Sequence, residues 1–396
     1  MRRTRTNPIE HAIETALQPG KFIGYGTSAS VVCGLAAVET GIKELITSAP
    51  ARAATLYEVF LAGCNEKADE LDDSLGHFGM FVDDLVCGWV KARQAAGADA
   101  DETAARLLTW MDHDQYGFFY HLERPLVKVA NDQTLAAFER RIRKRSEEPA
   151  TPTETADGDK RQVGQWRWAT ILRVILEAQH NVEAYSTLCE ETGVTAQDCL
   201  TVAKLLQPRR KLIDALTWVR RGLELDKRSG FGTGTCDLAK LERELLRKLG
   251  RSDEALDAAW AGFSAHPHQY AYEELMRYVP KNERAAWHAK AMDAAAGADL
   301  HSLIGLWLQT KEIDRLVERL HAATDAEIEG LSHYATEPVA KKLARSHPAV
   351  AARVYRALGM RILNAKKSKY YDAALSNFED AKRCYEKAGS ALSGAK

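Results

Sequence analysis

The sequence predicts an all-α protein, in which a helical-repeat α-solenoid follows an N-terminal helical block. Three observations lead to this fold class. Apolar residues recur three and four positions apart along most of the chain, which is the spacing of one face of a helix. Strict alternation of apolar and polar residues, the signature of a half-buried strand, is scarce. In the second half, a pattern of small and large residues recurs at a spacing of about 40 residues.

The predicted N-terminal helical domain, residues 1–146, contains four segments with helical periodicity, which are residues 50–71, 74–97, 97–114 and 131–145. Pro50 lies near the start of the first segment, where its fixed φ angle suits a helix. Gly97 is expected to end the second segment. Residues 147–161 are rich in Pro, Thr, Glu and Asp and poor in apolar residues, so we expect a linker or an exposed loop there. Residues 162–396 form the predicted helical-repeat domain.

The repeat pattern is clearest in residues 249–267. Gly250 suits a left-handed connection between two helices, Ser252 is expected to cap the second of them, and Pro267 to end it. Small residues at fixed offsets let paired helices approach to about 8–10 Å between their axes. The positions expected to make this packing are Ala215, Leu216 and Gly222 in residues 211–226, Ala255, Leu256 and Gly262 in residues 249–267, and Ala374, Leu375, Phe378 and Ala381 in residues 370–389.

These segments resemble the second helix of a tetratricopeptide-type repeat. The spacing exceeds the usual value of about 34 residues, and the first-helix signature of Trp followed by Leu-Gly is absent before Gly250. The resemblance therefore implies a tetratricopeptide-like solenoid rather than a strict one. The chain also resembles an uncharacterised bacterial all-helical family in residues 21–35, 51–118 and 236–293. Some members of that family are labelled SWIM zinc-finger proteins, but this chain lacks the CxC…CxH ligand set, so we expect no zinc.

The composition narrows the possible functions. The 54 Lys and Arg residues nearly balance the 55 Asp and Glu residues, which argues against a dedicated polyanion binder. Seven cysteines without a CxxC pair indicate free thiols in a reducing cytoplasm. The amino terminus is basic but has no apolar run after it, and no stretch approaches the roughly 20 apolar residues of a membrane helix. We therefore expect a cytoplasmic protein without membrane association.

A cluster of basic residues ends the first block, and it consists of Arg140, Arg141, Arg143, Lys144 and Arg145. Such a cluster is a candidate surface for nucleic-acid phosphates. The plainer interpretation is that cations are favoured at the carboxyl end of a helix, here beside an acidic segment. No aromatic interleaving or recognition motif accompanies the cluster. Residues 208–211 form a weaker basic cluster.

Two further patterns are candidates for chemistry. Asp112, His113, Asp114 and His121 combine carboxylates with imidazoles, as metal sites and acid–base sites do, but such residues also end helices and begin turns. The glycine-rich residues 229–236 follow a helix rather than a strand and lack the Gly-Lys-Ser/Thr of a phosphate-binding loop. Neither pattern predicts a catalytic residue, a metal or a cofactor.

The sequence thus predicts a non-enzymatic interaction protein that binds a peptide or protein partner on a helical-repeat surface. The groove is expected to be lined by first helices of the repeats, such as residues 236–249 and 281–296. The alternative hypothesis is a nucleic-acid-associated protein that uses the basic cluster at residues 140–145.

Overall fold

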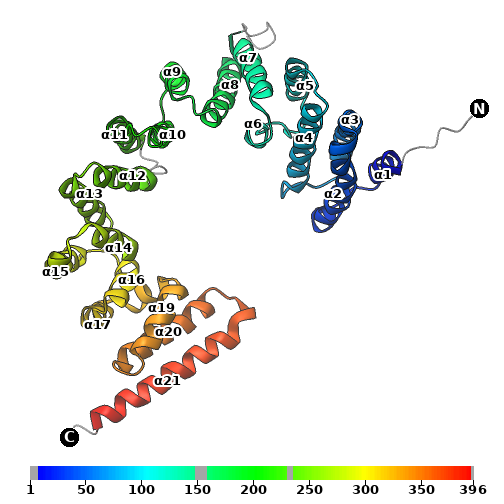
Figure 1. The fold of residues 1–396 in the computed structure, drawn as a ribbon. Coiled ribbons are helices and arrows are strands. Elements are labelled where there is room, and N and C mark those ends of the chain that lie inside the picture. Colours follow the sequence, from blue (N-terminus) through cyan, green and yellow to red (C-terminus); the bar gives the residue numbers. More distant parts are fainter. Residues whose placement is uncertain (1–7, 148–157, 230–234, 394–396) are drawn as a thin grey trace, which may run out of the picture. The chain divides into compact units, whose positions relative to one another are not determined.

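The computed structural model describes residues 8–147, 158–229 and 235–393, which form 21 α-helices (Figure 1). Apart from an isolated parallel bridge between Ile23 and Leu71, these ranges contain no β-structure. The prediction of an all-α fold is confirmed. The chain divides into two compact units, Met1–Arg209 (unit 1) and Arg210–Lys396 (unit 2).

The described part of unit 1 contains the helices α1 (Pro8–Ala16), α2 (Tyr25–Ser48), α3 (Pro50–Ala68), α4 (His77–Ala95), α5 (Ala100–Asp112), α6 (Glu123–Leu126), α7 (Asp132–Glu147), α8 (Gly158–Ala178), α9 (Val182–Thr192) and α10 (Ala196–Leu206). The four helices expected in the first block correspond to α3, α4, α5 and α7. Gly97 has a φ of 67° and ends the turn after α4, as predicted. The long helix α2 was not assigned from the sequence.

The predicted linker, residues 147–161, falls mostly outside the described residues. Its first residue ends α7, and its last four residues belong to α8. Helix α8 packs on α7 and on α9, so α8, α9 and α10 belong to unit 1, although their residues were placed in the second domain from the sequence.

The core of unit 1 is centred on the contact of α2, α3 and α4. Tyr57 on α3 is fully buried, and its hydroxyl donates to Glu39 Oε1 on α2 at 3.5 Å. Gly88 on α4 faces this ring so closely that a Cβ atom there would lie 2.3 Å from Tyr57 Cζ. The small residue at position 88 therefore lets the two helices pack around the tyrosine.

A second buried network joins α8, α9 and α10. Asp198 is 3% exposed and accepts hydrogen bonds from Arg173 Nε and from the Tyr185 hydroxyl, each at 2.9 Å. Asp198 also forms a capping box with Thr195 at the start of α10. Because each of these polar groups has a hydrogen-bond partner, the network connects the three helices and leaves no buried charge of the network unpaired.

Unit 2 contains, within its described residues, α11 (Leu212–Ser229), α12 (Thr235–Lys248), α13 (Ser252–Ala265), α14 (Gln269–Tyr278), α15 (Arg284–Ala295), α16 (Leu300–Thr310), α17 (Ile313–Ala322), α18 (Asp325–Gly330), α19 (His333–Leu343), α20 (Pro348–Asn364) and α21 (Tyr371–Ser393). Most of these helices pack on a neighbour along the chain, such as α11 on α12, α13 on α14 and α20 on α21. Their shared apolar core runs from α13 to α21.

The structure describes every residue expected to pack helix against helix. Six of these positions are buried, namely Ala215, Leu216, Gly222, Ala255, Ala374 and Ala381. Leu256 is partly buried against the core. Phe378 is also partly buried, and it fills the space beside Gly359 of α20, where a Cβ atom would lie 2.6 Å from the ring.

Two of these residues differ from the packing expected. Leu375 is 60% exposed, because successive helical residues point about 100° apart and the face of α21 that meets α20 is the one carrying Ala374 and Ala381. Gly262 is exposed, and a Cβ atom there would meet only Arg243 Nη1, at 4.0 Å, so its small size does not serve a close helix contact. Gly250 has the predicted positive φ, 76°. The N-cap of α13 is Arg251 rather than Ser252, which is the first helical residue.

Candidate functional site

The basic cluster at the end of α7 is engaged within unit 1. Arg140 Nη2 lies 2.9 Å from Asp101 Oδ2 on α5, and Arg141 Nε lies 3.7 Å from the other oxygen of this carboxylate. Arg143 pairs with Glu139 at 2.9 Å, and Arg145 pairs with Asp112 at 3.3 Å. Lys144 is exposed. Four of the five cations therefore already face a carboxylate, which reduces the positive potential available to a phosphate backbone.

The acidic and histidine residues near α5 build a turn. One oxygen of Asp114 accepts backbone N–H bonds from Tyr116, Gly117 and Phe118, and the other oxygen accepts from Phe119. His113 Nδ1 lies 2.7 Å from the carbonyl oxygen of Thr109. The carboxylates and imidazoles thus do not converge, and in the described part of the chain no three His, Cys, Asp or Glu side chains are placed to hold a metal ion.

A pair of buried carboxylates lies close by, and sequence reasoning did not single it out. Asp83 Oδ1 on α4 and both oxygens of Glu123 on α6 are buried without a hydrogen-bond partner among the described residues. His121 Nδ1 lies 3.8 Å from Glu123 Oε1. Burial, together with the charges of Asp84 and Glu123, raises the pKa of Asp83 to about 6, and burial raises the pKa of Glu123.

We expect unit 1 to become less stable as the pH rises from about 4 to about 6. The ordinary pKa of Asp83 is 3.8 and its folded pKa is about 6, so between these values the folded state holds a proton that the unfolded state has lost. Asp83→Asn removes this penalty and should stabilise unit 1 at pH 8 by at most about 3 kcal/mol, with the gain shrinking below about pH 6. Hydrogen exchange of α4 peptides at pH 5 and pH 8 measures the effect. Glu66→Gln on the exposed face of α3 is the control, and an equal gain in both variants would contradict the assignment.

A polar relay joins three helices of unit 2. The Tyr272 hydroxyl lies 2.8 Å from His288 Nδ1, and His288 Nε2 lies 3.0 Å from Glu312 Oε1. The relay joins residues as far as 40 positions apart in the sequence, and no local motif predicts it. These residues line neither of the two hollows that follow, so we assign the relay the role of connecting α14, α15 and the start of α17.

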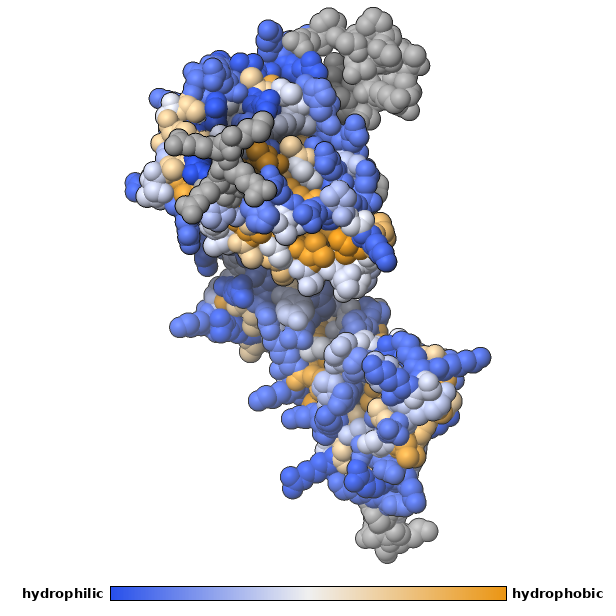
Figure 2. All heavy atoms as spheres, turned by 90° about the vertical axis from the view of Figure 1, so that its right-hand side faces the viewer, coloured by the Kyte–Doolittle hydropathy of each residue, from blue (hydrophilic) through white to orange (hydrophobic). Residues whose placement is uncertain are grey.

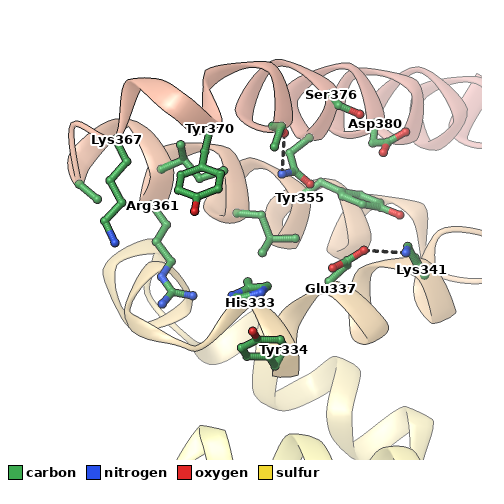
Figure 3. Close-up of a pocket in the computed structure, with 15 residues that line it drawn as sticks. His333, Tyr334, Glu337, Lys341, Tyr355, Arg361, Lys367, Tyr370, Ser376 and Asp380 are labelled. Carbon is green, nitrogen blue, oxygen red and sulfur yellow. Dashed lines mark hydrogen bonds and ion pairs between the residues drawn. The ribbon is translucent and has the colours of Figure 1, made fainter. Parts of the chain in front are cut away.

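Helices α19, α20 and α21 border a hollow of about 820 Å³ (Figure 3), a size typical of ligand sites. Its lining combines aromatic and charged side chains, among them Tyr334, Tyr355, Arg361, Lys367, Tyr370 and Asp380. The α19 residues that line it recur at helical spacing, since His333, Glu337 and Lys341 lie four residues apart. Burial and the negative charge of Asp380 raise the pKa of Tyr355 above its usual value of 10.

A second hollow, of about 520 Å³, lies on the other side of α19, between that helix and α16. Tyr334 lines both hollows and is 81% exposed. Its ring lies against that of His333, with the two ring centroids 3.8 Å apart (Figure 3). Pro338 lies inside α19 and has no N–H to donate to the Tyr334 carbonyl four residues earlier. The two hollows therefore meet at the exposed ring of Tyr334 on α19. Pro338 interrupts the backbone hydrogen bonding of this helix.

Unit 1 also carries exposed hydrophobic side chains. In Figure 2, hydrophobic residues gather in a patch on the visible surface of this unit, among mostly hydrophilic neighbours. Its most exposed large hydrophobic residues are Phe22 (68%) and Met80 (66%). We assign no ligand to this patch, because apolar atoms make up much of the surface of any folded protein. None of the described helices is both long enough and apolar enough to cross a membrane.

The fold and the paired hollows define an all-α protein with a ligand-sized recess at one end of its C-terminal unit. The model of a family described as "Family of unknown function (DUF6880)" matches residues 8–391, so the chain belongs to this family. No curated protein matches the chain. The family description names no activity, and the function has to be inferred from the surface of the chain itself.

Proposed function

We propose that the protein binds a peptide segment of a protein partner and carries out no covalent step. The observation that carries this proposal is the pair of hollows in unit 2 that meet at the exposed ring of Tyr334. Exposed aromatic rings beside concave surfaces are the side chains that most often anchor a protein partner. Together the hollows extend along both sides of α19, which suits an extended or helical segment better than a small molecule.

The proposal includes a helical-repeat, tetratricopeptide-like organisation of unit 2. Its support is that most helices of unit 2 pack on neighbours along the chain, as they do in arrays of stacked helix pairs. The buried small residues Ala215, Ala255 and Ala374, at matching positions, add to this support. The proposal also includes a reducing compartment such as the cytoplasm, because none of the seven cysteines, all of which lie in the described residues, forms a disulfide.

Crosslinking from position 334 tests the proposal. With the photoreactive residue benzoylphenylalanine in place of Tyr334, we expect a discrete protein adduct in an extract of the source organism. The same residue in place of Tyr25, an exposed aromatic of unit 1, is the control and should give no such adduct. Tyr334→Ala should weaken binding of the captured partner by about tenfold or more, without changing the circular dichroism of the protein. Equal adducts at both positions would rule out a specific site at α19.

A nucleic-acid role for the basic cluster has weaker support, because four of its arginines have carboxylate partners. Electrostatic binding to nucleic acid strengthens as salt is lowered. Titration of the protein with labelled single- and double-stranded oligonucleotides at low salt tests this role. We expect no saturable binding, and binding that Arg140→Gln weakens would favour this role over peptide binding.

A further inference from the structure

The larger hollow contains a buried cationic atom without a partner. Arg361 comes from α20, and its Nη1 atom is buried without a hydrogen-bond partner among the described residues. A guanidinium nitrogen that has lost water and gained no acceptor is costly, and a ligand that supplies the acceptor recovers this cost. Carboxylates fit this requirement well, because the planar guanidinium group donates to both carboxylate oxygens at once.

The carboxylates that line the hollow are paired with other cations and do not neutralise its positive end. Glu337 is paired with Lys341 at 2.6 Å, and Asp380 is paired with Arg383. Lys367 lines the same hollow, and within the described residues it has no carboxylate partner. Figure 3 shows Lys367, Arg361 and Tyr370 on one side of the hollow, and the Glu337–Lys341 pair on the other. Arg361 and Lys367, which have no carboxylate partner among the described residues, therefore lie at one end of the hollow. The Glu337 carboxylate, which is paired with Lys341, lies at the other end.

The hollow also has an apolar and aromatic wall. Leu358 and Ile362 on α20, Ala373 on α21, and the rings of Tyr355 and Tyr370 all line the hollow. Burying apolar ligand surface against such a wall is favourable at roughly 25 cal/mol per Å². A free phosphate or another small anion would leave this wall uncovered. The hollow therefore suits a ligand that presents a carboxylate next to a large apolar side chain.

We propose that this hollow binds an acidic peptide segment of a protein partner, with an Asp or Glu carboxylate on Arg361 and Lys367 and a neighbouring apolar side chain against Tyr355 and Tyr370. The inference rests on the proposed function, because it names the chemistry of the partner segment for the same site. It predicts that recognition depends on one acidic residue and weakens as salt rises, since the pairing is electrostatic.

Selection from a random library of displayed dodecapeptides on the full-length protein tests the inference. We expect the enriched peptides to share an acidic residue next to a large apolar residue. A synthetic peptide of that consensus should bind about tenfold to a hundredfold more weakly to the Arg361→Gln variant, and its Asp→Asn or Glu→Gln form should lose as much on the wild-type protein. Lys367→Gln should weaken binding less and serves as a second variant in case Arg361→Gln fails to fold.

Lys382→Gln is the matched control, because Lys382 lies on α21 with its side chain 77% exposed and does not line the hollow. It should bind the consensus peptide as the wild type does. A consensus without an acidic residue, or binding that neither Arg361→Gln nor Lys367→Gln reduces, would overturn the inference and leave the proposed peptide-binding function standing. A protein from which no peptide is enriched, and which gives no adduct at position 334, would overturn both.

Discussion

Gly88→Ala is expected to destabilise unit 1 by about 3 kcal/mol, because the added methyl group would collide with the ring of Tyr57. A Cβ atom at position 88 would lie 2.3 Å from Tyr57 Cζ and 2.4 Å from its hydroxyl oxygen. The ring is fully buried and its hydroxyl contacts Glu39, so it cannot move aside without disturbing α2. The substitution therefore forces α3 and α4 apart or breaks the contact with Glu39.

Hydrogen exchange followed by peptide mass spectrometry measures this effect, because it reports on α3 and α4 separately from unit 2. Gly34→Ala is the matched control: Gly34 is also within a helix, and a Cβ atom there meets nothing within 4 Å. That control should stabilise α2 by about 0.5–1 kcal/mol, the usual gain when alanine replaces glycine in a helix. Exchange rates in α3 and α4 that stay unchanged in Gly88→Ala would show that the helices pack differently from the structure described.

Asp198→Ala is expected to cost unit 1 about 3 kcal/mol, because it leaves the partly buried guanidinium of Arg173 without its carboxylate. The Arg173 side chain is 16% exposed and keeps the neutral acceptors Thr192 Oγ1 at 2.8 Å and the Gly193 carbonyl at 3.0 Å. The substitution also removes the acceptor of the buried Tyr185 hydroxyl and half of the capping box with Thr195. Exchange of peptides from α8, α9 and α10 measures the loss.

Arg140→Gln is the control for this prediction, since it breaks an exposed ion pair of the same unit and should change stability by less than about 1 kcal/mol. The network also has a pH signature. Burial opposes ionisation of Asp198, but its hydrogen bonds with Thr195 and the charge of Arg173 outweigh burial and lower its pKa from 3.8. The stability from this carboxylate is therefore present above about pH 4 and lost as the pH falls below it. Equal losses in Asp198→Ala and Arg140→Gln would contradict a buried network.

These expectations differ in how far the sequence alone supports them. Helix α13 follows from local signals, because Gly250 permits the left-handed turn before it and Pro267 comes just after its end. The burial of Ala215 and Ala255 follows from spacing along a helix. The prediction from spacing was wrong for Leu375 and Gly262. The neighbouring helix decides which face of a helix is buried, and spacing along the chain does not show where that neighbour packs.

The candidate site could not be predicted from the sequence for the same reason, because it depends on how helices pack on one another. Sequence reasoning selected residues that are adjacent in the chain, such as Arg140–Arg145 and Asp112–Asp114, and the structure engages them in ion pairs and turns. The hollow is instead assembled from single residues on three helices, between His333 and Asp380. One available signal was Pro338 inside a helical segment, next to the exposed Tyr334.

The sequence by itself determined that this protein is helical and approximately where helices such as α3, α4 and α13 lie, because helix periodicity, glycine turns and proline stops act over a few residues. The tertiary structure alone decided that Gly88 faces Tyr57, that Asp198 meets Arg173, and that Arg361 is left without an acceptor in a hollow. Each of these depends on contacts between residues far apart in the chain. The free energy of such contacts is set by burial and by the partner each polar group finds, which no local pattern records.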